Sequence, residues 1–297
     1  MSLLSPYDKV GIIAPSSNLS GQDLTPFIEL LKSWSIESIL ADNLESSYRY
    51  MAGDDSFRAS SLNKMLEDKK IKVLFCLRGG AGATRILPYI NYQALQSYPK
   101  TIVGLSDSTA LQNAVYAITG NSALTGFLPL YDTHNNRIDD KMAAELHRAL
   151  FDDKRCISSG AALITGEAQG EIVGGCLSVL TQLCGTPYFP NLKNKILLLE
   201  DVGEKTYKID LMLTQLKNQP DFKQLGGIIF GVFNNCPIKD EIDGTIDDCL
   251  RDFTKGLTIP VIKDFAYGHI PERYILPIGK KVIVRSQKDN CVLEYDC

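Results

Sequence analysis

The sequence predicts an α/β fold: an N-terminal parallel sheet flanked by helices, followed by a smaller C-terminal α/β domain. Short apolar segments alternate with segments of helical periodicity, and the connections between them are short. Turn-forming residues follow several of the apolar segments directly. Because ligands of open α/β sheets bind at the carboxyl ends of the strands, we expect functional residues in these turns.

In the first half of the chain, the order of the elements predicts a parallel sheet covered by helices on both faces. The helix that follows residue 108 has Leu111, Val115 and Ile118 on one face, and an earlier helix has Leu62 and Met65 facing inward. Expected strands lie at 9–15, 36–40, 73–77 and 101–103, and expected helices at 24–34, 56–67, from about 84, after 108 and at 139–150.

The second half opens after a polar segment without periodicity, where we place the domain boundary. This predicts an N-terminal domain at 1–152, a linker at 153–166 and a C-terminal domain at 167–297. A glycine-rich segment at 170–176 leads into a helix with Leu177, Leu180 and Leu183 inward. Expected strands lie at 195–201, 226–233, 260–263, 281–285 and 292–295, and expected helices at 207–216 and 240–253.

The composition is that of a soluble globular protein. The 297 residues are 44% hydrophobic and 22% charged, with a formal net charge of −4. Neither a nucleic acid nor a membrane is an expected partner, because there is no basic excess and no long apolar run. The first residues lack the pattern of a secretory signal, so we expect a cytoplasmic protein.

The eight cysteines and three histidines do not form a recognisable metal motif. No CxxC pair occurs, and His134, His147 and His269 lie far apart in the sequence. A zinc site is therefore not expected. Several cysteines lie in apolar segments, which favours reduced, buried thiols over disulfides.

A serine follows the expected strand at 101–103 in a tight turn that leads into a helix. Such a turn is the geometry of a nucleophile elbow, in which the residues two before and two after the serine must be small. Gly104 and Ser108 meet this requirement around Ser106. The alternative is that Ser106 or Asp107 merely caps the helix, because capping serines are common.

A second turn, Arg78-Gly-Gly-Ala-Gly82, also stands between a strand and a helix. Its backbone N–H groups could bind an anion, as in an oxyanion hole or a carboxylate pocket, or its glycines could simply form a tight turn. It matches neither a Walker loop nor GxGxxG, which disfavours a nucleotide site. Arg78 could hold a carboxylate in bidentate fashion, or it could form an interdomain salt bridge.

The remaining candidates lie in the second half. Glu200 and Asp201 end an apolar strand, and adjacent strand residues point to opposite faces, so at most one faces a given site. Solvated loop acids are the alternative for both. His269 lies in a turn beside Gly268, where it could transfer protons or serve as a structural hydrogen-bonding group. The order serine, acid, histidine is that of α/β-hydrolases.

The sequence resembles the L,D-carboxypeptidases, serine peptidases that include muramoyltetrapeptide carboxypeptidase and the microcin C immunity proteins. The resemblance extends over almost the whole chain, and several motifs occur in the family order. They are 12–17, Leu77-Arg-Gly-Gly-Ala-Gly82 with 85–89, Gly104-Leu-Ser-Asp-Ser-Thr109, Gly174-Gly175 with Gly185-Thr-Pro-Tyr188, Leu199-Glu-Asp201 with 209–210, and Gly268-His269 with Leu276-Pro-Ile-Gly279.

The resemblance implies Ser106 as nucleophile, Glu200 rather than Asp201 as the acid, and His269 as general base, in a cleft between the two domains. It implies hydrolysis of the bond to the terminal D-alanine of a murein tetrapeptide in the cytosol. No metal or organic cofactor is implied, and a homodimer is suggested. The N–H of Asp107 and one from the Gly79-Gly80 loop, with Gly80 preferred, would hold the oxyanion. We further infer that Arg78 holds the substrate carboxylate.

Three positions depart from the family pattern and bear on the substrate. The family usually has an aromatic residue at Ala81, an asparagine at Cys176, and an asparagine near 273–274. One alternative is therefore a microcin C immunity-type peptidase that cleaves peptidyl or aminoacyl nucleotide analogues. Trp34, the only tryptophan, is expected in a helix core, which disfavours it for a base-stacking role, although a tyrosine could serve instead. A second alternative is a non-catalytic peptide-binding protein, which the presence of all three triad residues disfavours.

Overall fold

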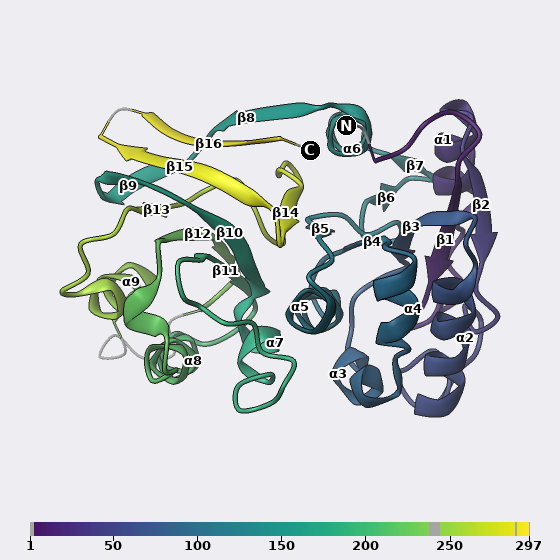
Figure 1. Ribbon diagram of the computed structural model, residues 1–297, viewed down its shortest axis with the longest axis horizontal. Helices are drawn as coiled ribbons and strands as arrows, with labels where there is room; N and C mark the ends of the chain where they lie inside the picture. Colours follow the sequence, from purple (N-terminus) through teal and green to yellow (C-terminus); the bar gives the residue numbers. More distant parts are fainter. Residues whose placement is uncertain (1–2, 238–243, 289, 297) are drawn as a thin grey trace. The chain divides into compact units, whose positions relative to one another are not determined.

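The computed structural model describes residues 3–237, 244–288 and 290–296 (Figure 1). The chain divides into two compact units. The N-terminal unit comprises Met1–Asp153 and Tyr274–Gly279, and the C-terminal unit comprises Lys154–Arg273 and Lys280–Asp296. No helix among the described residues is both long and apolar enough to cross a membrane.

The N-terminal unit contains a six-stranded sheet with the strand order β14-β5-β4-β3-β1-β2. The first five strands of the chain in this sheet are parallel, and β14 joins its edge antiparallel to β5. The strands are β1 Lys9–Ile13, β2 Glu37–Leu40, β3 Ile71–Cys76, β4 Thr101–Gly104, β5 Ala123–Thr125 and β14 Leu276–Ile278.

Helices cover both faces of this sheet, as the sequence predicts. Figure 1 shows α1 and α6 on one side and α2, α4 and α5 on the other. Phe27, Phe75 and Phe127 pack against one another in the core, with ring centroids 5.0 to 6.3 Å apart. The remaining elements are α1 Thr25–Ser33, α2 Asp55–Glu67, α3 Ala83–Ile86, η1 Leu87–Tyr89, α4 Tyr92–Ser97, α5 Ser108–Thr119, β6 Thr133–His134, β7 Arg137–Ile138 and α6 Asp140–Phe151.

The apolar face expected on α5 is correct at two of its three positions. Leu111 and Val115 are fully buried, whereas Ile118 is 36% exposed. Ile118 lies in the last turn, immediately before the helix ends at Gly120, which has φ of 74°. The apolar periodicity therefore extends to Ile118, one turn beyond the part of α5 that other residues of the N-terminal unit bury.

The C-terminal unit contains an eight-stranded mixed sheet with the order β8-β16-β15-β10-β11-β12-β13-β9. Strands β10 to β13 are parallel, and the other pairs are antiparallel. Its elements are β8 Lys154–Ser158, β9 Ala161–Ile164, β10 Gly166–Cys176, α7 Leu177–Thr181, β11 Ile196–Val202, α8 Thr206–Lys217, η2 Phe222–Gln224, β12 Gly227–Asn234, α9 Ile246–Thr254, β13 Val261–Lys263, β15 Lys281–Gln287 and β16 Asn290–Asp296.

Three features of the sequence-based organisation differ from the structure. The segment 153–166, expected to be a linker, contains β8 and β9, both at edges of the sheet. Its strand signal is weak because Arg155 is one of the two buried side chains of β8. Residues 274–279 belong to the N-terminal unit, where Pro277 is accommodated because β14 is an edge strand. The helix expected at 240–253 begins at Ile246, and residues 240–243 lie outside the described part of the chain.

Candidate active site

Ser106 occupies a strained turn between β4 and α5. Its φ is +65°, a left-handed conformation that non-glycine residues adopt at a cost of about 1–3 kcal/mol. A Cβ added to Gly104 would lie 2.5 Å from the Cβ of Ser108, so only glycine fits where the chain folds back. Ser106 remains partly exposed, whereas Ser108 is fully buried. This is the geometry expected of a nucleophile elbow.

The helix-capping interpretation of this turn is not what the structure shows for Asp107. Asp107 is the N-cap residue of α5, but its side chain makes no cap hydrogen bond. Its Oδ2 instead accepts hydrogen bonds from the Ser16 hydroxyl, at 2.6 Å, and from the Ala83 N–H, at 2.8 Å. Burial raises the pKa of the Asp107 carboxyl, against the opposing effects of these two bonds and of the nearby Arg58 charge.

The glycine loop of residues 78–82 lies directly against the elbow. A Cβ added to Gly79 would come within 2.8 Å of the Ser106 Cβ and 2.9 Å of its Oγ. Gly80, with φ of +115°, packs in the same way against the Ser17 side chain. Within residues 3–237, 244–288 and 290–296, the N–H groups of Gly79, Gly80 and Asp107 have no hydrogen-bond acceptor. The turn thus places unused donors beside a serine, which is the arrangement that an oxyanion hole requires.

Arg78 lies half-buried at the start of this loop. Its Nη1 is 3.4 Å from the Asn18 carbonyl oxygen. It forms no ion pair with any residue in the described ranges, so the structure offers no partner for the salt bridge considered above. Its charge therefore remains available to an anionic group.

In the C-terminal unit, Glu200 and His269 form a buried pair. Glu200 is fully buried near the end of β11, and its Oε2 lies 2.8 Å from the His269 Nδ1. Gly268, with φ of +119°, leaves room for this carboxylate, because a Cβ there would lie 2.7 Å from Oε2. Asn234 holds the turn by donating to the His269 carbonyl oxygen at 2.7 Å. Hydrogen bonds to the ring and to the carbonyl oxygen therefore both hold His269 in place.

Asp201 points the other way, as adjacent strand residues must. Its Oδ2 accepts the Ser178 N–H at 2.7 Å, and its Oδ1 accepts the Val202 N–H at 2.8 Å. Burial is the main cause that raises the pKa of its carboxyl. Cys176, the last residue of β10, lies beside it, with Sγ 3.7 Å from Oδ1. Asp201 thus anchors the first turn of α7, and it is not the carboxylate that contacts His269.

The structure therefore assembles two groups of the expected site residues. Ser106, Asp107 and the glycine loop lie together in the N-terminal unit, and Glu200 and His269 lie together in the C-terminal unit. The other histidines lie elsewhere: His134 is exposed in β6, and His147 packs on Trp34 with ring centroids 5.2 Å apart. Trp34 packs on α6, but it follows α1 as its C-cap residue and is only partly buried, so its expected place in a helix core is not what the structure shows.

Sequence reasoning missed the residues that support the glycine loop. Ser16 and Ser17 follow the expected strand at 9–15 and have no pattern that assigns them a role, although Ser16 donates to Asp107 and Ser17 lies against Gly80. Arg58 gave no signal, because an arginine in a polar helix is normally solvated. It is buried, and its Nη1 donates to the Gly82 carbonyl oxygen at 2.8 Å.

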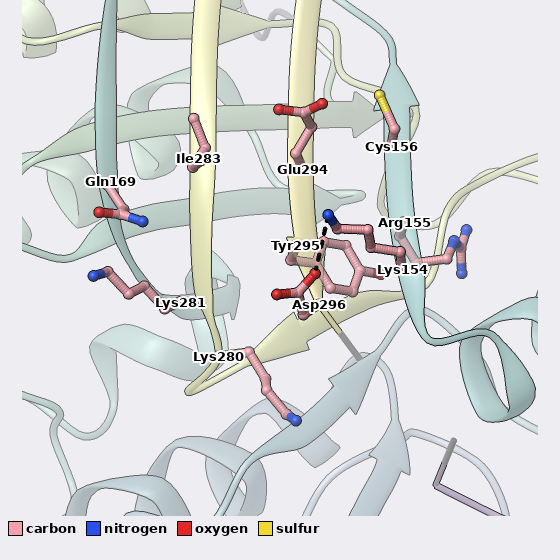
Figure 2. A pocket seen from close by; sticks show the side chains of 10 residues that line it. All are labelled: Lys154, Arg155, Cys156, Gln169, Lys280, Lys281, Ile283, Glu294, Tyr295 and Asp296. Atoms are coloured by element: carbon pink, nitrogen blue, oxygen red, sulfur yellow. Dashed lines mark ion pairs between the residues drawn. The ribbon is translucent and has the colours of Figure 1, made fainter. Parts of the chain in front are cut away.

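A separate cavity of about 520 Å³ lies in the C-terminal unit (Figure 2). It includes none of the expected site residues. Lys154 and Asp296 form an ion pair in it at 3.7 Å. Its lining residues are Lys154, Arg155, Cys156, Gln169, Lys280, Lys281, Ile283, Glu294, Tyr295 and Asp296. The cavity is therefore distinct from the groups described above.

Similarity to known proteins covers most of the chain. The family model for the LD-carboxypeptidase N-terminal domain matches residues 10–126, and that for the LD-carboxypeptidase C-terminal domain matches residues 169–284. A Bacillus subtilis strain 168 protein named "Probable murein peptide carboxypeptidase" is 31% identical, over 98% of this chain and 93% of its own. The "Murein tetrapeptide carboxypeptidase" of Pseudomonas aeruginosa is 28% identical, over 95% of each chain.

The fold is also that of a solved member of this group. The crystal structure of muramoyltetrapeptide carboxypeptidase from Oxalobacter formigenes superimposes with a TM-score of 0.88 at 24% identity, over 97% of this chain and 99% of that one. This similarity concerns the fold. The matches to both family models and the 31% identity to the Bacillus subtilis protein over nearly the whole chain identify this chain as a member of the LD-carboxypeptidase family.

Proposed function

We propose that the protein is a serine-type L,D-carboxypeptidase that releases the terminal D-alanine from murein tetrapeptides. The observation that carries this proposal is the buried pair in which Glu200 Oε2 lies 2.8 Å from His269 Nδ1. A carboxylate in this position orients an imidazole and stabilises the cation that forms when the imidazole accepts a proton. The strained Ser106 and the near full-length relatives named for murein peptides add support.

The proposed reaction passes through an acyl-enzyme. Because Nδ1 of His269 faces Glu200, the other ring nitrogen, Nε2, takes the proton of the Ser106 hydroxyl. The Ser106 Oγ bonds to the carbonyl carbon of meso-diaminopimelate, and the bond from that carbon to the D-alanine nitrogen breaks. The proton held by His269 goes to the leaving amine. Water then attacks the ester, giving its proton to His269, and the Ser106 hydroxyl is restored. The proposal requires Ser106 and His269 to meet during the reaction.

The remaining roles belong to the N-terminal unit. We assign the developing oxyanion to the N–H groups of Asp107 and Gly80, which lack acceptors among the described residues. Removing one such donor typically slows an enzyme about 10²–10³-fold. We assign the carboxylate of the terminal D-alanine to Arg78, which lacks an ion-pair partner in the same part of the chain. Specificity for a carboxypeptidase substrate would then rest on this one cation.

The substrate could instead be a peptidyl or aminoacyl nucleotide analogue, as for the microcin C immunity proteins. Such a substrate favours an aromatic side chain that stacks on the base. Trp34 packs edge-on against His147 and Phe151 of α6, so it is already engaged. This observation favours the murein peptide over the nucleotide analogue.

Two further parts of the proposal concern the setting of the enzyme. We place it in the cytoplasm, because the seven described cysteines are free and reducing compartments favour thiols.

We propose a homodimer on the basis of the family resemblance. Sedimentation equilibrium of the purified chain would measure the mass, and a monomer at micromolar concentration would contradict the dimer.

The test is mass spectrometry of the purified protein incubated with L-Ala-γ-D-Glu-meso-diaminopimelate-D-Ala, beside the Ser106→Ala variant. We expect the wild type alone to release D-alanine. Release by both would exclude Ser106 as nucleophile. Release by neither, with turnover of an aminoacyl nucleotide analogue, would favour the immunity-type activity. Turnover of neither the tetrapeptide nor the nucleotide analogue, with tight binding of the tetrapeptide, would favour a non-catalytic binding protein.

A further inference from the structure

The peptide group that joins Gly82 to Ala83 is held on both of its polar atoms by buried charged side chains. Its carbonyl oxygen accepts a hydrogen bond from Arg58 Nη1 at 2.8 Å. Its N–H donates to Asp107 Oδ2 at 2.8 Å. Hydrogen bonds with an ionised partner are stronger than neutral ones, especially away from water. The end of the glycine loop is therefore fixed in orientation, because a rotation of this peptide group would break both bonds.

The same two side chains also hold the turn that follows β1. Arg58 Nη1 donates to the Pro15 carbonyl oxygen, and Asp107 Oδ2 accepts from the Ser16 hydroxyl at 2.6 Å. Arg58 and Asp107 thus bridge two neighbouring loops in parallel. One loop contains Gly79, which abuts Ser106, and the other contains Ser17, which abuts Gly80. Both loops border the proposed oxyanion donors.

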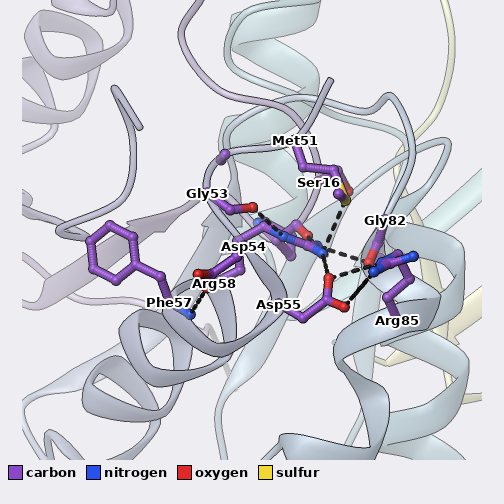
Figure 3. A network of polar contacts seen from close by, with 12 residues as sticks. Ser16, Met51, Gly53, Asp54, Asp55, Phe57, Arg58, Gly82 and Arg85 are labelled. Atoms are coloured by element: carbon purple, nitrogen blue, oxygen red, sulfur yellow. Dashed lines mark hydrogen bonds and ion pairs between the residues drawn. The ribbon is translucent and has the colours of Figure 1, made fainter. Parts of the chain in front are cut away.

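The guanidinium of Arg58 uses its full capacity to donate hydrogen bonds at this position. All five of its N–H groups have acceptors: Nε donates to the Gly53 carbonyl oxygen at 3.2 Å, and Nη2 donates to Asp55 Oδ1 at 2.5 Å and to Met51 Sδ at 3.2 Å. Figure 3 shows the guanidinium surrounded by these groups. A Cβ on Gly82 would lie 3.0 Å from Arg58 Nη1, so the loop needs a glycine where the arginine approaches.

We propose that Arg58 and the Asp107 carboxylate are positioning residues that hold the glycine loop against Ser106. We call this pair the loop clamp. The inference rests on the proposed acyl transfer at Ser106, and it adds a function for two buried charges that the triad does not use. The clamp makes no contact with the reacting atoms. It keeps the Gly80 N–H where the oxyanion forms, which lowers the barrier without tightening substrate binding.

A neighbouring arginine offers a matched control. Arg85 also binds Asp55, through Nη2 at 2.6 Å and Nε at 2.9 Å, but its side chain is 48% exposed. Among the described residues, its only bond to the loop is from its backbone N–H to the Gly82 carbonyl oxygen at 3.1 Å, which a side-chain substitution keeps. Arg85→Gln therefore removes one arginine from the same carboxylate and leaves the clamp in place. Arg58→Met removes the guanidinium and keeps an unbranched apolar side chain, and Arg58→Lys keeps one cation that cannot span the same acceptors.

The first readout is independent of activity. In hydrogen–deuterium exchange of the folded proteins, we expect the peptide that covers residues 79–86 to exchange at least about 10-fold faster in Arg58→Met than in the wild type or in Arg85→Gln. Because Arg58→Met could fail to fold, Asp107→Ala and Asp107→Asn form a second pair. The asparagine oxygen can replace Oδ2, so exchange should be slower in Asp107→Asn than in Asp107→Ala. Equal exchange in all variants would overturn the clamp.

The second readout is catalytic, measured on folded protein well below each melting temperature. We expect kcat for D-alanine release to fall about 10²-fold in Arg58→Met, with KM changed less than about 3-fold. The kcat of Arg58→Lys should lie between those of Arg58→Met and the wild type, and that of Arg85→Gln should equal the wild-type value. The rate at which a fluorophosphonate labels Ser106 should fall in parallel. If the wild type is labelled but releases no D-alanine, slower labelling in Arg58→Met still supports the clamp while the proposed substrate fails. A lower melting temperature with unchanged kcat and labelling would reduce Arg58 to a purely structural role.

Discussion

Glu200 Oε2 faces two donors of one residue: it lies 2.8 Å from the His269 Nδ1 and 3.2 Å from the His269 backbone nitrogen. A single carboxylate oxygen therefore restrains both the imidazole and the turn that carries it. The neighbouring Asp201 restrains α7 instead, through the Ser178 N–H. Two consecutive acids thus have different structural tasks, which can be separated by mutation.

Glu200→Gln should lower kcat roughly 10³–10⁴-fold, because a neutral amide neither stabilises the imidazolium nor fixes the tautomer. Asp201→Asn should lower kcat less than about 10-fold and should mainly reduce the melting temperature, since an amide has one acceptor oxygen in place of two. Steady-state kinetics and thermal unfolding of both variants provide the comparison. A larger loss of kcat in Asp201→Asn would show that the acids have been assigned the wrong way round.

Gly79→Ala should lower kcat about 10²-fold, because the new methyl group would lie 2.8 Å from the Ser106 Cβ and must displace it. Gly226→Ala is a suitable control, since a Cβ there has its nearest neighbour at an ordinary 3.4 Å. Labelling of Ser106 by a fluorophosphonate gives the rate at the nucleophile directly. Wild-type labelling in Gly79→Ala would mean that the loop and the elbow separate easily.

Among the described cysteines, Cys156 should react first with iodoacetamide, because it is exposed, whereas Cys76 is fully buried. Burial also raises the pKa of Cys76 to about 12, which leaves roughly one thiolate in 10⁴ at pH 8. Peptide mapping with and without denaturant would rank the sites, and Cys156→Ser should remove the fast phase. Rapid modification of Cys76 in the folded protein would contradict its burial beneath the elbow.

The raised pKa of Asp107 makes a signed prediction for stability against pH. Because the native state keeps this proton when the unfolded chain has lost it, the Asp107 contribution to stability falls as pH rises from 3.8 to its higher native pKa. Asp107→Asn lacks this titration, so the wild type should lose stability relative to the variant across that window and hold a constant difference above it. Denaturant unfolding of both proteins from about pH 4 to pH 7 measures the difference. A relative gain by the wild type with rising pH would reverse the sign.

The sequence predicts four of the six strands of the N-terminal sheet, β1 to β4, since each combines a short apolar segment with a turn at its carboxyl end. It does not predict β5, which is only three residues long. Nor does it predict β14, because Pro277 argues against a strand and its partner β5 lies far earlier in the chain. It does not predict Arg58 either. That side chain and Ser61 are buried on α2 together with Leu62 and Met65, so the inward face of the helix is partly polar and its periodicity is weak.

The same physical reason limits what could be said of the site. Local patterns identify Ser106, the glycine loop and His269 as turn residues, because turns are encoded by neighbours in sequence. They leave Glu200 and Asp201 equivalent, since alternation gives opposite faces without saying which face is which. The partners of Asp107, which are Ser16 and Ala83, come from two other loops. Such long-range contacts have no local signature.

The return of the chain to the first sheet has a consequence for biosynthesis. Strand β14 belongs to the N-terminal unit but lies at Leu276–Ile278, after most of the C-terminal unit has been made. When only the first 153 residues have left the ribosome, β5 of the nascent chain is therefore an unpaired edge strand. Such an edge is a template for pairing with other chains. Truncation after Asp153 should yield an aggregation-prone fragment, and the two units cannot be obtained separately by a single cut in the chain.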